Sequence, residues 1–67
     1  MNKRAIREFL AVYGNNYREK REKAKLKQLE VAKIIGCSQA IISHIECGYM
    51  LPPEHIEKAL NEIYEEI

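Results

Sequence analysis

This 67-residue sequence has no aspartate, no long apolar run and only two cysteines, and each shortage excludes a class of protein. Without Asp, and with no nucleophile placed beside an oriented base, the chain lacks the pattern of a catalytic site, and we predict that it is not an enzyme. No run is long enough to span a bilayer, and no signal-peptide pattern is present. We therefore expect a soluble cytoplasmic protein with no membrane partner, no cofactor and no small-molecule ligand.

The two cysteines, Cys37 and Cys47, do not suggest a secreted disulfide framework. A helix between them would separate the two by about 15 Å, since each residue adds ~1.5 Å, so we expect free thiols. Together with His44 and His55 they are zinc ligands by type. However, the pattern Cys-x6-His-x2-Cys-x7-His lacks the closely paired ligands of structural zinc sites, and we predict no metal site.

The net charge of +1 conceals an uneven distribution along what we expect to be one domain, residues 1–67. Residues 1–45 hold ten Lys or Arg and four Glu, a balance of +6, whereas residues 46–67 hold one Lys and six Glu, a balance of −5. Such asymmetry is a hint of a nucleic-acid-binding surface. The acidic end would then have to face away from the phosphates.

The most informative stretch is residues 28–48, which predicts two short helices joined by a tight corner. The first helix, 28–35, has four apolar residues at helical spacing: Leu29, Val31, Ala32 and Ile35. Gly36 follows where a left-handed residue without a Cβ is needed. Ser38 is a good N-cap for the second helix, its hydroxyl accepting from a backbone N–H near Ala40 or Ile41.

The second helix of this pair, 39–47, has two different faces. Ile42 and Ile45 are three residues apart and are expected to point inward. The other side carries Gln39, Ala40, Ser43, His44 and Cys47. That face has no carboxylate, which is unusual in a chain so rich in Glu. Two helices joined by a Gly-containing turn, the second with a polar and non-acidic face, form a helix-turn-helix motif at about 28–47.

Residues 1–13 predict a further helix with a single apolar stripe: Ile6, Phe9, Leu10 and Tyr13. Asn2 is a candidate cap for its start. Three roles are open for this helix: completing the core, forming part of a dimer contact, or lying along the DNA backbone. We place core completion first, because four apolar residues in register are usually buried.

Gly14-Asn15-Asn16 predicts a break before another helix at 17–25, which has few apolar residues. The densest basic run in the chain follows the break: Arg18, Lys20, Lys23, Lys25 and Lys27. Most such runs are simply solvated. Its position directly before the helix-turn-helix makes phosphate binding an equal alternative.

Pro52-Pro53 ends the preceding segment, and a last helix is expected at 53–66. Its apolar stripe consists of Ile56, Ala59, Leu60, Ile63 and Ile67. The final part of this helix, with Ile63, Tyr64 and Ile67, would be exposed in a monomer. Exposed apolar strips usually contact a partner, so we predict a homodimer through these three residues.

The stretch from Arg21 to Pro52 resembles the lambda-repressor-like helix-turn-helix domains of the Cro/C1 or Xre type, over about half of the chain. The residues that carry the match are Arg21, Leu26, Gln28, Glu30, Ala32, Gly36, Ser38, Gln39, Ile42, Ser43, Ile45, Glu46, Gly48 and Pro52. The resemblance implies a compact all-α domain of four to five helices. It also implies a DNA-binding transcriptional regulator, specifically a small Cro/C1-type repressor that binds a palindromic operator as a dimer in a bacterial or phage-infected cell.

The second motif helix would then enter the major groove, where each base pair shows a distinct pattern of donors and acceptors. The candidate base-contacting residues are Gln39, Ala40, Ser43 and His44. Relatives imply that Gln28 braces Gln39 against adenine while bonding phosphate. The candidate phosphate contacts are Gln28, Lys27, Arg18, Lys25, Cys47 and Tyr49, with main-chain groups of Gly48 and Tyr49 replacing the family's usual Asn at position 47.

In the family, an Arg at position 21 pairs with the Glu at position 46. If the pair is half-buried, removing one partner costs ~3–5 kcal/mol, whereas an exposed pair contributes ~0–1 kcal/mol. The main alternative function is a helix-turn-helix that acts on another regulator, as an antirepressor or antitoxin-like module. Its expected sign, an acidic or apolar recognition face, is absent from this sequence.

Overall fold

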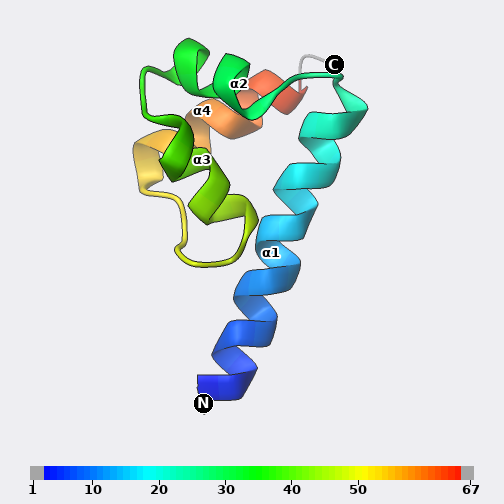
Figure 1. Ribbon diagram of the computed structural model, residues 1–67, viewed down its shortest axis with the longest axis vertical. Helices are drawn as coiled ribbons and strands as arrows, with labels where there is room; N and C mark the ends of the chain where they lie inside the picture. Colours follow the sequence, from blue (N-terminus) through cyan, green and yellow to red (C-terminus); the bar gives the residue numbers. More distant parts are fainter. Residues whose placement is uncertain (1–2, 66–67) are drawn as a thin grey trace.

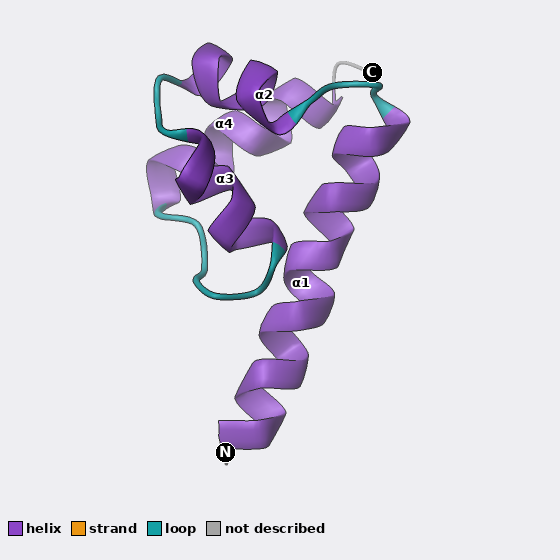
Figure 2. Ribbon diagram, in the orientation of Figure 1, coloured by secondary structure: helices purple, strands orange, loops and turns teal. Residues whose placement is uncertain are grey.

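The computed structural model describes residues 3–65, and within that range the chain forms four helices and no strand (Figures 1 and 2). These are α1 (Lys3–Lys23), α2 (Gln28–Ile35), α3 (Gln39–Glu46) and α4 (Glu54–Glu65). The all-α prediction is confirmed. The expected cap Asn2 and the expected interface residue Ile67 lie outside the described residues. None of the four helices is long and apolar enough to cross a membrane.

The prediction of two separate helices at 1–13 and 17–25 is wrong. The helix α1 runs without a break through Gly14-Asn15-Asn16. A Cβ at Gly14 would lie less than 3 Å from the carbonyl oxygens of Ile45 and Glu46. Glycine is therefore needed here for the close approach of α1 to the end of α3, and not for a turn. Asn15 accepts a 2.6 Å hydrogen bond from Arg18 on the surface of this continuous helix.

A second glycine, Gly48, also allows the backbones of α1 and of the chain after α3 to approach closely. Gly48 has a φ of +78°, and a Cβ there would lie 2.9 Å from the Cα of Ala11. The two backbones therefore touch where α3 ends, with Gly14 on one helix and Gly48 just after the other. This crossing fixes the direction in which α1 passes the end of α3, as Figure 1 shows.

The core lies between α2, α3, α4 and the C-terminal half of α1. Its buried apolar side chains are Tyr17, Val31, Ala32, Ile42, Ile45, Ile56 and Leu60. The N-terminal half of α1 projects beyond the other helices (Figure 1), and Ile6 and Phe9 are 42% and 56% exposed there. Core completion by this segment is therefore wrong for Ile6 and Phe9, since no other helix covers them. Tyr13 alone of that stripe packs against the core.

The last helix, α4, begins after Pro53, whose carbonyl oxygen accepts from the backbone N–H groups of Ile56 and Glu57 at 3.0 and 2.8 Å. Ile63 and Tyr64 are half-buried and pack against the core, so the expectation that they are exposed is wrong. Tyr64 is held there by Tyr17, whose ring centroid lies 6.5 Å away. Their role in a dimer stays a prediction.

Candidate nucleic-acid interface

The corner between α2 and α3 is built from the residues that the sequence indicated. Gly36 adopts a left-handed φ of 88°, and the N–H groups of Gly36 and Cys37 both donate to the Ala32 carbonyl, at 2.8 and 3.0 Å. The Ser38 hydroxyl accepts from the N–H of Ile41 at 3.3 Å. Both helix ends at the corner are therefore satisfied, which holds α3 at a fixed angle to α2.

The predicted division of α3 into two faces is present. Ile42 and Ile45 are 1% and 2% exposed. On the other side, the exposed residues are Gln39, Ala40, His44 and Cys47, and Ser43 is half-buried. The His44 ring packs against the Tyr49 ring, with centroids 5.8 Å apart. The row that was expected to meet base edges is thus open to solvent and carries no exposed carboxylate.

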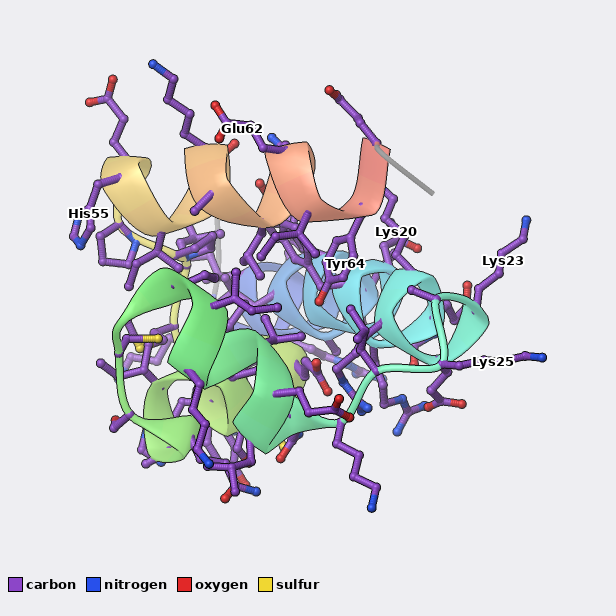
Figure 3. All side chains as sticks on the ribbon, turned by 90° about the horizontal axis from the view of Figure 1, so that it is seen from above. Lys20, Lys23, Lys25, His55, Glu62 and Tyr64 are labelled. Carbon is purple, nitrogen blue, oxygen red and sulfur yellow. The ribbon has the colours of Figure 1, made fainter. Side chains whose placement is uncertain are left out.

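The acidic helix lies on the other side of the molecule. Figure 3 looks at the protein from above and shows α4 along one edge, with α2 and α3 along the opposite edge. Glu62 lies on the α4 side of that view, away from α3, where it lines a hollow with Ile34 and Ile35 at the end of α2. A polyanion lying against the outer face of α3 would therefore approach the domain from the side that does not carry α4.

An ion pair ties α1 to the end of α3. The Arg21 guanidinium donates to the two carboxylate oxygens of Glu46 at 2.7 and 3.0 Å, and a third bond of 2.9 Å goes to the Leu26 carbonyl. The two side chains are only 13% and 3% exposed, so the buried form of this pair is the one observed. Hydrogen bonding to Glu46 raises the pKa of Arg21, although burial acts in the opposite direction.

Two side-chain amides, those of Gln28 and Gln39, link this ion pair by hydrogen bonds to the outer face of α3, which we call the recognition face (Gln39, Ala40, Ser43, His44 and Cys47). Gln28 Nε2 donates to Glu46 at 3.0 Å, and Gln39 Nε2 donates to Gln28 Oε1 at 3.5 Å. A carboxylate can only accept, so Glu46 forces Gln28 to present its amide nitrogen inward and its oxygen toward Gln39. Gln39 must then use one N–H on Gln28, which leaves its second N–H and its carbonyl oxygen free.

The start of α2 is stabilised in a way that we did not anticipate. Lys27 has no hydroxyl to cap the helix, but its backbone N–H donates to the Glu30 carboxylate at 2.9 Å. This is the reciprocal half of a capping box. The spacing of Glu30 three residues after the cap was the signal in the sequence. The Lys27 side chain is left exposed beside Gln28.

The main chain after α3 does not offer the phosphate donors that were expected. The N–H of Gly48 donates to the Ile45 carbonyl at 3.2 Å, and that of Tyr49 donates to the His44 carbonyl at 2.9 Å. Both groups are used to cap α3, because Gly48 turns the chain back on the helix. These two N–H groups are therefore already bonded within the fold, and phosphate binding by Cys47 and Tyr49 stays a prediction. The Tyr49 side chain is 76% exposed and the Cys47 side chain is also exposed.

The basic run does not form one face. Arg18 is engaged by Asn15 and by Glu22, the latter at 3.5 Å. Lys20, Lys23 and Lys25 spread around the C-terminal end of α1 in Figure 3. Lys20 and Lys23 line a hollow together with Tyr64 on α4, and none of the described residues that line it belongs to α3. Phosphate binding by Arg18 and Lys25 stays a prediction.

Both cysteines are free thiols, as expected. Burial raises the pKa of Cys37, which lies at the corner between α2 and α3. Within residues 3–65, no three His, Cys or Glu side chains are grouped so that they would hold a metal ion.

The comparison with known families agrees with this geometry. A family model described as helix-turn-helix, of the Cro/C1 type, matches residues 18–63. The match covers the C-terminal part of α1, all of α2 and α3, and most of α4, and it begins after the projecting half of α1. No curated protein matches the chain.

Proposed function

This chain belongs to the Cro/C1-type helix-turn-helix family of DNA-binding regulators, and from that premise we propose that it is a small repressor that binds a palindromic operator as a dimer. The observation that carries the proposal is the exposed, carboxylate-free face of α3, from Gln39 to His44, on the side opposite the acidic α4. A major groove admits one helix, and this is the helix that presents side chains free to meet bases.

Gln39 supplies the sequence preference in this proposal. Adenine offers a donor at N6 and an acceptor at N7 in the major groove, whereas guanine offers two acceptors. The carbonyl oxygen and second N–H that Gln28 leaves free on Gln39 form the complementary acceptor and donor. The amide therefore favours adenine, and its 3.5 Å contact with Gln28 supports this orientation before DNA is bound.

The neighbouring residues of the face complete the reading of a half-site. Ala40, one residue along the helix, packs on a thymine methyl group. Ser43 and His44, about one turn further on, donate to a base or a phosphate. The exposed Lys27 at the start of α2 contacts the phosphate backbone. Gln28 contacts it through the second N–H of its amide nitrogen, since the first is donated to Glu46.

A dimer is proposed because one helix of eight residues reaches only a single half-site. In dimeric helix-turn-helix proteins the two recognition helices lie about 34 Å apart, so that they meet successive major grooves on one face of the duplex. The end of α4, with the half-buried Ile63 and Tyr64, is the proposed contact. Sedimentation equilibrium with and without a palindromic duplex measures the stoichiometry, which we expect to be two chains per duplex.

The function is tested by electrophoretic mobility shift on the DNA upstream of the gene, with a shuffled duplex of equal length and composition as control. Specific retention of the upstream DNA, with an affinity that falls steeply as salt rises, is the expected result. Equal retention of both duplexes at every salt concentration would instead favour a module that acts on another regulator.

A further inference from the structure

The projecting half of α1, which precedes the matched residues 18–63, brings a basic side chain to the end of the recognition helix. Arg7 lines a hollow together with Leu10 from the same helix and with Cys47, Gly48 and Tyr49 from the chain that follows α3. The close crossing of the two backbones at Gly48 holds these segments together. Arg7 is therefore positioned by packed backbone, although it lies outside the helix-turn-helix itself.

Arg7 differs from the other arginines in its charge partners. Arg4 pairs with Glu8 at 3.5 Å, and Arg18 and Arg21 pair with Glu22 and Glu46. Among residues 3–65, Arg7 has no such ion pair, and none of the residues that line its hollow is acidic. Its guanidinium is exposed and free to bind an anion that approaches the end of α3.

Other donors at this end of α3 are already used. The N–H groups of Gly48 and Tyr49 cap the helix, and Cys47 carries only a weak S–H donor. An anion beside the end of α3 therefore has to be held by side chains. Arg7 is the charged residue in the hollow, and Tyr49, which is 76% exposed, adds a phenol hydroxyl.

We propose that Arg7 binds the phosphate backbone of duplex DNA at the edge of the major groove, beside the C-terminal end of α3. The proposal rests on the proposed function, since it assumes that the outer face of α3 lies in that groove. The other proposed phosphate contacts, Lys27 and Gln28, come from the start of α2, where Gln28 bonds both Gln39 and Glu46 of α3. Phosphate contacts from α1 and α2 together fix the register of α3 on the duplex, while its outer face reads the bases.

The test compares Arg7→Ala, Arg7→Lys and the matched control Arg4→Ala, which removes the same charge from the same helix one turn earlier. Binding of each variant is measured by fluorescence anisotropy across a salt series, on the preferred duplex and on a shuffled one. Circular dichroism establishes that each variant keeps the helical content of the unmodified protein.

Arg7→Ala is expected to weaken binding of both duplexes by the same factor and to reduce the slope of log K against log salt by about one. Arg7→Lys should keep the slope, and Arg4→Ala should leave affinity and slope unchanged. An Arg7→Ala protein that binds like the unmodified one, or that matches Arg4→Ala, overturns this inference alone. A parent protein that shows no preference between the two duplexes overturns the proposed function instead.

Discussion

Replacing Arg21 by Met tests the buried ion pair that joins α1, α3 and the recognition face. The substitution leaves the Glu46 carboxylate, 3% exposed, with Gln28 as its remaining donor. Breaking a buried pair on one side costs about 3–5 kcal/mol. A domain of this length is expected to have a free energy of unfolding of only about 3–10 kcal/mol, at roughly 0.05–0.15 kcal/mol per residue. Arg21→Met should therefore remove a third or more of the stability, or unfold the chain.

Urea unfolding followed by circular dichroism measures this loss. The control is Arg18→Met, because Arg18 and Glu22 form an exposed pair, with side chains 54% and 63% accessible, and should lose at most about 1 kcal/mol. The double variant Arg21→Met with Glu46→Leu should regain most of the stability, since apolar residues of similar volume replace buried pairs at little cost.

Two outcomes would refute this reasoning. If Arg21→Met costs no more than Arg18→Met, the Arg21–Glu46 pair is not desolvated in solution. If the double variant is as unstable as the single one, the cost comes from lost packing and not from an unpaired buried charge.

Three further predictions concern other parts of the structure. Gly14→Ala should destabilise the fold by more than about 1 kcal/mol in urea unfolding, because its Cβ would overlap backbone carbonyls of α3. Tyr64→Phe should raise the stability at neutral pH by up to about 1 kcal/mol, because the buried hydroxyl has no hydrogen-bond partner within residues 3–65. Burial raises the pKa of Tyr64 from 10.0 to about 12, so above pH 10 the phenol ionises more readily in the unfolded chain than in the folded one. The free energy of unfolding should therefore not vary with pH through this group below pH 10, and it should fall between pH 10 and about 12. Tyr64→Phe should reduce that fall. Operator DNA should slow alkylation of the exposed Cys47 by iodoacetamide, as followed by mass spectrometry, and leave the rate at Cys37 unchanged.

The sequence predicted the parts of the interface that depend on local chemistry. Gly36 and Ser38 mark the corner because a left-handed residue and an N-cap are needed wherever two helices meet so tightly. The apolar spacing of Ile42 and Ile45 placed the opposite face of α3 outside. The contact between Gln28 and Gln39 followed from the family resemblance, and the two amides are 3.5 Å apart in the structure.

Features that depend on a contact between segments far apart in the sequence could not be predicted from local residue patterns. Gly14 has the composition of a helix breaker, and only the nearness of α3 shows that it is a spacer within one helix. The sequence does not show whether the backbone N–H of Gly48 is free, whereas in the fold it donates to the Ile45 carbonyl. Arg7 had no assigned role, because its position beside Tyr49 arises from the crossing of α1 with the end of α3.

The most direct measurement is selection of preferred sites from random duplex DNA by the unmodified protein and by Gln39→Ala. If α3 reads bases as proposed, the unmodified protein selects a palindromic consensus. Gln39→Ala should then select the same consensus with one position per half-site relaxed from adenine, at a cost of about 1–3 kcal/mol. A parent protein that enriches no sequence, or a variant whose consensus is unchanged at every position, would contradict the account.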